Sequence, residues 1–229
     1  VVRRAERQAA DRDTARAPPR ARCAALAVAS GAGMRALYES LGVFVVDGGP
    51  TLSPSTFELL AGIHAARAEQ VVVLPNGADV VLVAERAAEL SDKVAAVVPT
   101  TSQQAGLAVA LALDPERDAR ANAAAMDAAL RALRTGGVAH AAREDPAGRW
   151  AVGDAVGYVG DELVAWGDPE RTLGAVLAGL ADGAGPITCI AGDGAPLADE
   201  RVRALAPAGV ELELSRGGQP SWWWLLAAG

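Results

Sequence analysis

Short apolar runs alternate with helix-length stretches of Ala and Leu along the first half of the chain, a pattern typical of β-α-β units around a parallel sheet. We predict strands at residues 26–30, 43–47, 71–74 and 94–98, each followed by a helix. Ser55 and Glu58 have the spacing of a capping box at the start of the second helix, and Thr101 and Gln104 repeat it before the fourth. The fold class is therefore predicted to be α/β, with a Rossmann-like parallel sheet over residues 23–113.

The pattern changes after residue 113. Asp114 and Pro115 have the residue types of an N-cap and a first helical position, so we predict a long Ala-rich helix that bridges two subdomains over residues 114–135, with the Gly pair at 136–137 ending it. Residues 136–229 are predicted to form a second, mixed-sheet α/β subdomain. Its expected strands are 138–142, 150–152, 154–159, 162–166, 187–191, 210–215 and 222–226, with a hairpin turn at 160–161 and helices at 168–180 and 197–205.

The loops after three first-half strands are rich in Gly, Asn and hydroxyl groups. Parallel strands bring their carboxyl ends to one edge of a sheet, where open α/β sheets bind ligands. Paired glycines allow close approach to the backbone, and hydroxyls near a helix start can hold a carboxylate or phosphate, although the same residues also form turns and caps. We predict a rim for a ligand or partner made of Gly48, Gly49, Thr51, Ser53, Asn76, Thr100, Thr101 and Ser102.

Three consecutive tryptophans stand near the end of the chain, in the segment that follows Gln219. Neighbouring residues of a strand point to opposite faces, so at least one of these rings leaves the core that the others line. Trp is favoured at protein interfaces. Candidate partner contacts are therefore Gln219, Trp222, Trp223 and Trp224, with packing between the two subdomains as the alternative.

Composition narrows the classes of function. The 229 residues are 51% hydrophobic with a net charge of −7, and the first 22 residues hold seven Arg against three acids, so the acidic surplus lies in the body. A nucleic-acid partner is not expected without a clustered basic surface, and we interpret residues 1–22 as a flexible basic linker. Apolar runs fall short of the ~20 residues that span a bilayer, so no membrane span is expected.

Signals for catalysis or metal binding are missing from the sequence. Phosphate-binding loops, dinucleotide fingerprints, nucleophile elbows and zinc-protease motifs do not occur, and Cys23 and Cys189 lack metal-ligand spacing. We expect buried free thiols, a cytoplasmic location, and neither a catalytic nor a metal-ligating residue. Because the first residue is Val, we expect a fragment or a processed chain of a longer protein.

Four motifs together carry a family resemblance: GGPTLSPST at 48–56, VLPNG at 73–77, VPTTSQQAGL at 98–107 and GGQP at 217–220. In order and spacing they resemble the C-terminal region of the fatty-acid kinase A subunit. This family is also described as dihydroxyacetone-kinase-like or "DAK phosphatase" proteins, and the resemblance covers about residues 23–226. The family pattern usually has GGQTMNPST and PNN, so this chain departs from it at Pro50, Ser53 and Gly77.

The resemblance implies a DegV-like fold with a Rossmann-like half and a mixed-sheet half. In the family, ATP and Mg belong to an upstream kinase domain that is absent here, so we expect no cofactor on this chain. The expected role is a non-catalytic module that supports phosphoryl transfer to a fatty acid, or to glycerone by the family label, by docking an acyl-carrying DegV-type partner. The alternative is a stand-alone binder of a fatty acid or small phosphorylated ligand, held by Thr51, Ser53, Thr100 and Thr101. An independent hydrolase is a third, weaker interpretation.

Overall fold

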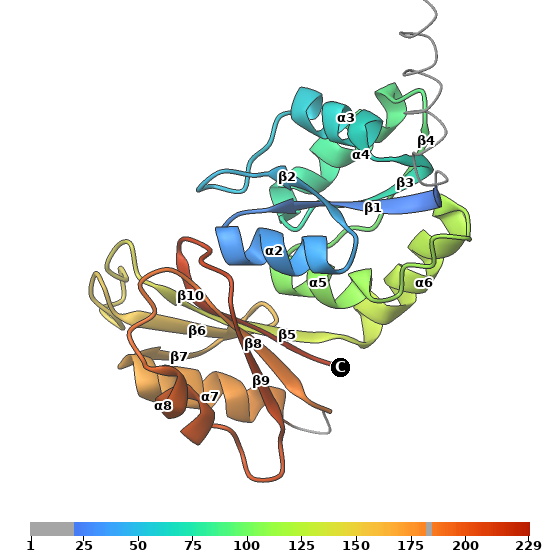
Figure 1. The fold of residues 1–229 in the computed structure, drawn as a ribbon. Helices are drawn as coiled ribbons and strands as arrows, with labels where there is room; N and C mark the ends of the chain where they lie inside the picture. Colours follow the sequence, from blue (N-terminus) through green and yellow to red (C-terminus); the bar gives the residue numbers. More distant parts are fainter. Residues whose placement is uncertain (1–20, 182–184) are drawn as a thin grey trace, which may run out of the picture.

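A computed structural model describes residues 21–181 and 185–229 as two sheets joined by helices (Figure 1). Most of the predicted linker at residues 1–22 lies outside the described residues. Ala21 and Arg22 already belong to the first strand. The order of the two halves is the one expected from the sequence, a parallel sheet followed by a mixed one.

Sheet A consists of four parallel strands in the order β2-β1-β3-β4. They are β1 (Ala21–Ala29), β2 (Phe44–Asp47), β3 (Ala68–Leu74) and β4 (Val94–Val97). Five helices and a 3-10 turn join or follow these strands: α2 (Ala32–Ser40), α3 (Thr56–Ala65), η1 (Ala78–Val80), α4 (Val81–Leu90), α5 (Gln103–Ala110) and α6 (Ala119–Ala132). The central strands are covered on both faces, which explains their nearly continuous apolar sequences.

The two faces of sheet A are buried in different cores. Leu26 and Val28 of β1 pack against α3 and α4, whereas Ala25 and Ala27 point to the opposite side, toward α2, α5 and α6. The second core also contains Ile190 and other residues of sheet B. One hydrophobic core therefore extends across both halves.

Sheet B has six strands in the order β7-β6-β5-β10-β8-β9, antiparallel except for the pair β8 and β9. Its strands are β5 (Arg134–His140), β6 (Ala155–Val159), β7 (Glu162–Gly167), β8 (Ile187–Ala191), β9 (Leu212–Arg216) and β10 (Trp222–Ala228). Helices α7 (Pro169–Leu180) and α8 (Asp199–Ala204) cover the face turned away from sheet A (Figure 1). Asp168 caps α7 and Gly160 makes the β6–β7 turn, both as predicted from the sequence.

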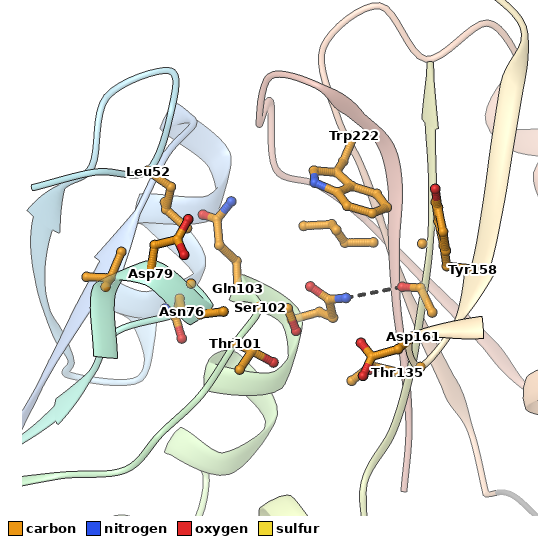
Figure 2. A pocket seen from close by; sticks show the side chains of 18 of the residues that line it. Leu52, Asn76, Asp79, Thr101, Ser102, Gln103, Thr135, Tyr158, Asp161 and Trp222 are labelled. Carbon is orange, nitrogen blue, oxygen red and sulfur yellow. Dashed lines mark hydrogen bonds between the residues drawn. The ribbon is translucent and has the colours of Figure 1, made fainter. Parts of the chain in front are cut away.

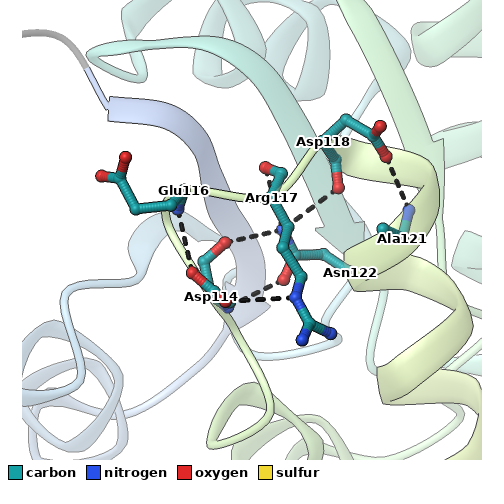
Figure 3. A network of polar contacts seen from close by, with 6 residues as sticks. All are labelled: Asp114, Glu116, Arg117, Asp118, Ala121 and Asn122. Carbon is teal, nitrogen blue, oxygen red and sulfur yellow. Dashed lines mark hydrogen bonds and ion pairs between the residues drawn. The ribbon is translucent and has the colours of Figure 1, made fainter.

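The predicted start of the long helix at Asp114 and Pro115 is wrong. Figure 3 shows that Asp114 closes a separate turn, in which the buried Asn122 amide donates to the Asp114 carbonyl oxygen at 2.9 Å and its oxygen accepts from the Asp114 amide at 2.8 Å. Asp118 is the N-cap instead, accepting from the Ala121 amide at 2.8 Å. The helix ends at Ala132, and the Gly pair expected to end it lies within β5.

The strand predicted at residues 150–152 is also absent, because this segment belongs to a folded loop between β5 and β6. Asp145 is nearly buried there and accepts two hydrogen bonds from the Arg149 guanidinium, at 2.8 and 3.0 Å. The Arg149 guanidinium lies over the rings of Trp150 and Trp166, with its central carbon 4.7 and 5.7 Å from the ring centroids. Side-chain contacts, not a strand ladder, order this loop.

Both cysteines are free and buried, as expected. Burial raises the pKa of Cys189 to about 12 and also raises the pKa of Cys23, so both thiols are protonated at neutral pH. Across residues 21–181 and 185–229, no helix combines the length and apolar character needed to cross a membrane.

Candidate functional site

A cleft of about 310 Å³ opens where the carboxyl edge of sheet A meets sheet B (Figure 2). The first wall comes from the loops after β2, β3 and β4, as the parallel topology predicts. The second wall comes from β5, β6, β10 and the β6–β7 turn. Of the predicted rim, Thr51, Ser53, Asn76, Thr101 and Ser102 line the cleft, whereas Gly48, Gly49 and Thr100 do not.

The glycines of the first loop shape it without lining the cleft. The Gly48 amide donates to the Ala29 carbonyl oxygen at 3.0 Å, and the Asp47 carboxylate accepts from the Gly49 amide at 2.9 Å. Gly49 has a φ of 64°, which glycine adopts without strain. This turn places Thr51 and Ser53 at the cleft and leaves the glycines behind them.

Asn76 and Thr100 belong to a buried hydrogen-bond network beneath the cleft. The Asn76 side-chain amide donates to the Val28 carbonyl oxygen at 2.7 Å and to Tyr38 Oη at 2.8 Å, and the Thr100 hydroxyl donates to Asn76 Oδ1 at 2.8 Å. Burial raises the pKa of Tyr38, which as a neutral phenol donates to the Gln103 carbonyl oxygen at 2.7 Å. The prediction that Thr100 belongs to the exposed rim is wrong: Thr100 and the Asn76 side chain hold the loops in place.

The start of α5 differs from the predicted capping box. The N-cap is Ser102, which makes no capping hydrogen bond with its side chain. Gln103 Oε1 accepts from the Ser30 amide at 2.8 Å, and Gln104 Nε2 donates to the Gly136 carbonyl oxygen at 3.1 Å, the dashed line in Figure 2. The two glutamines tie α5 to both halves, so the box expected at Thr101 and Gln104 does not form.

Only one of the candidate partner contacts near the C-terminus lines the cleft. Trp222 lies edge-on to Tyr158, with ring centroids 6.2 Å apart. A bulge between Trp222 and Trp224 turns Trp223 and Trp224 toward the α7 side, where Trp224 is fully buried. The Trp side chains are thus divided between the two faces of the strand, as predicted.

Gln219 is also fully buried and donates to the Ile190 carbonyl oxygen at 3.1 Å. As isolated surfaces for a partner, Gln219 and Trp224 are therefore ruled out by burial. The alternative considered from the sequence, packing between and within the halves, describes both residues.

Sequence reasoning missed the second wall and the charges of the cleft. Asp79 and Asp161 line it from opposite sides, and no Lys, Arg or His occurs among the described lining residues. Asp161 is recognisable from the sequence only as part of a turn, which it also forms. Pairing among β5, β6 and β10 brings Tyr158 and Thr135 to the cleft from distant positions, and only strand alternation hinted at this.

The lining residues do not fit a magnesium nucleotide. They offer no basic side chain for the phosphates. Over the described part of the chain, no group of three His, Cys, Asp or Glu side chains could hold a metal ion. The available groups are hydroxyls, amides, two carboxylates and an aromatic pair, which suit recognition of a bound surface.

Comparison with known proteins identifies the family. The sequence profile of the FakA-like C-terminal family, which describes the C-terminal region of proteins like the A subunit of fatty acid kinase, matches residues 24–228. Protein YloV of Bacillus subtilis is 28% identical over 212 residues, which cover 88% of this chain and 38% of YloV. The chain thus spans about two fifths of that relative's length.

Solved structures show the fold. The DegV family protein Cg2579 of Corynebacterium glutamicum superposes with a TM-score of 0.63 at 16% identity, over 91% of this chain and 98% of that one. The Streptococcus pneumoniae fatty acid kinase (Fak) B3 protein, in a structure loaded with linoleic acid, gives a TM-score of 0.57 at 10% identity, over 90% and 98%. The chain has a DegV-like fold, and it belongs to the FakA-like C-terminal family of fatty acid kinase.

Proposed function

We propose that this chain is a non-catalytic docking module of a fatty-acid-kinase A-like protein. It binds an acyl-carrying DegV-type protein at the cleft between its halves and so holds the acyl carboxyl group near a kinase domain outside this chain. The observation that carries the proposal is the charge of the cleft: its charged lining residues are Asp79 and Asp161.

These two carboxylates oppose an anionic ligand. A fatty-acid carboxylate or a phosphate in the cleft would meet two like charges and no basic side chain, although the first turn of α5 offers free amides. A basic group on a protein surface would instead meet complementary charge, which speeds encounter and sets the orientation of docking. The cleft therefore favours a protein partner over a free acid.

Exposed apolar side chains adjoin the first wall. Phe57, near the start of α3, is 82% exposed, and Leu82, near the start of α4, is 75% exposed. Phe57 follows the lining residue Ser53 by four positions, and Leu82 follows Asp79 by three. Apolar surface beside polar and charged groups is the usual make-up of a protein interface.

Sedimentation or calorimetry with a purified, acyl-loaded DegV-family protein from the same organism tests the proposal. We expect 1:1 binding that weakens with salt, and a loss of about tenfold or more in the double variant Asp79→Asn/Asp161→Asn. Asp127→Asn is the matched control, because Asp127 is an acid on α6 that pairs with Arg131 and does not line the cleft. No binding by the unmodified chain, or equal binding by the double variant, would refute docking at this cleft.

The second candidate function is a stand-alone binder of a fatty acid or phosphorylated ligand. It draws on the hydroxyls of Thr51, Ser53, Thr101 and Ser102, which do line the cleft. Native mass spectrometry of protein purified from a lipid-containing lysate distinguishes the two functions. A stoichiometric fatty acid retained by the unmodified chain would favour the binder.

A further inference from the structure

Two cavities of different character lie along the seam between the halves. The polar cleft opens at the first turn of α5. An apolar groove of about 240 Å³ follows the later turns of the same helix, lined by Leu37 of α2, Leu107 and Leu111 of α5, and Ile190 of β8. A further groove shares Leu111 with it and extends it toward α6.

Gln104 is the one described residue that lines both the cleft and the groove. It is only 5% exposed, and its side chain crosses the seam to donate from Nε2 to the Gly136 carbonyl oxygen at 3.1 Å (Figure 2). Its Oε1 atom has no hydrogen-bond partner among the described residues. The side chain thus stands between a polar compartment and an apolar one.

An amphipathic acid needs both compartments, one for its polar head and the other for its alkyl tail. The cleft alone lies at the lower end of the ~300–1,000 Å³ range of small-molecule sites and the groove lies below it, whereas the two joined would lie well within it. A tail passing from one to the other would have to displace Gln104 and leave the Gly136 carbonyl oxygen without its hydrogen bond.

We propose that Gln104 is a partition that keeps long-chain acyl groups out of the seam and so leaves the cleft as a docking surface. The inference rests on the proposed function, in which this chain binds a carrier of the acyl chain and does not hold the acyl chain itself. The partition acts by bulk, with the bond to Gly136 fixing its position.

Substitutions at Gln104 separate bulk from polarity. Gln104→Ala removes the partition and joins the two compartments. Gln104→Met keeps a side chain of similar length and removes the unpaired oxygen, so the passage stays closed. Leu107→Ala enlarges the groove on the same helix without opening it to the cleft, because Leu107 lines the groove and not the cleft.

Linoleic acid is the probe, titrated against each purified variant by calorimetry and detected by native mass spectrometry. We expect no stoichiometric binding to the unmodified chain, Gln104→Met or Leu107→Ala. One bound molecule is expected in Gln104→Ala, with an affinity about a hundredfold higher because several methylene groups become buried. Thermal unfolding checks that each variant is folded, and Gln104→Ser replaces Gln104→Ala if the latter is not.

Binding by the unmodified chain, or no binding by a folded Gln104→Ala or Gln104→Ser, would overturn the inference. Binding by Gln104→Met as strong as that by Gln104→Ala would do the same. Partner binding is measured separately. If the unmodified chain ignores the DegV-type partner while only Gln104→Ala takes up linoleic acid, docking fails and the partition stands.

Discussion

Gly106 is the residue with least room beside the buried network under the cleft. A Cβ atom at this position in α5 would overlap Asn76 Oδ1 and lie 2.6 Å from Tyr38 Oη. Both atoms are held by other hydrogen bonds and have little freedom to move. We expect Gly106→Ala to lower the free energy of unfolding by about 1–3 kcal/mol, measured by urea denaturation.

Gly174 is the matched control, because it is also a helical glycine but has room around it. A Cβ there would meet Leu205 at 4.0 Å, an ordinary contact. We expect Gly174→Ala to leave stability unchanged or to raise it by up to about 1 kcal/mol, the difference in helix propensity. Equal effects of the two substitutions would show that the network does not restrict Gly106.

Asp145 makes the loop between β5 and β6 sensitive to acid. Hydrogen bonds from Arg149 hold the pKa of this carboxyl group below its ordinary value of 3.8. A lowered pKa means that its contribution to stability is present above the ordinary value and is lost as the pH falls through the lowered one. We expect the fluorescence of Trp150 and Trp166 to report loop opening only at the acid end of a titration from about pH 5 to pH 2.

Arg149→Met should move that opening to higher pH, because it removes the main cause of the lowered pKa and leaves Asp145 nearly buried. Arg86→Met serves as the control, since Arg86 forms an exposed ion pair with Glu89 on α4. An acid limb that is the same in Arg149→Met as in the unmodified chain would contradict the assignment.

At the scale of elements, α3 and α5 differ in how their first turns are held. Ser55 and Glu58 form a complete capping box, with the Glu58 carboxylate accepting from the Ser55 amide at 2.7 Å. Ser102 occupies the same place before α5 without a side-chain bond. We expect Ser55→Ala to cost about 1 kcal/mol and Ser102→Ala less than about 0.5 kcal/mol in denaturant unfolding. The reverse order would contradict the capping assignment.

These two helix starts also show how far local sequence reaches. Ser55 was predicted correctly because both partners of its box are local and exposed. Thr101 and Gln104 have the same spacing, yet Gln104 bonds to Gly136 in the other half, a partner that no local pattern reveals. Asp114 failed for a similar reason, since Asn122 holds it in a separate turn.

The candidate site divides in the same way at the scale of the whole molecule. Parallel order in sheet A fixes the edge where its loops gather, so the first wall could be predicted from strand-loop-helix patterns. The second wall depends on the pairing of β5, β6 and β10, which is not local. The inward direction of Asn76 and Thr100 depends on Tyr38, and the sequence carried no sign of that contact.

The two halves are joined too closely to unfold separately. Ile190 and Leu225 of sheet B lie in the same core as Ala25 and Leu74 of sheet A. Main-chain groups also meet directly, since the Met34 amide donates to the Gly217 carbonyl oxygen at 2.8 Å. A shared core and direct main-chain contact make partial unfolding of one half costly to the other.

We therefore expect a single calorimetric transition with equal calorimetric and van't Hoff enthalpies, despite the two sheets. Gly33→Ala should weaken this coupling, because a Cβ at Gly33 would overlap the Arg216 carbonyl oxygen and push α2 away from the loop after β9. For a chain of this size each kcal/mol lost lowers Tm by about 2–4 °C, so a shift should be measurable while Gly174→Ala shows none downward. Two resolved transitions in the unmodified chain would mean that each half is stable alone, and the cleft between them would then be free to change shape when a partner binds.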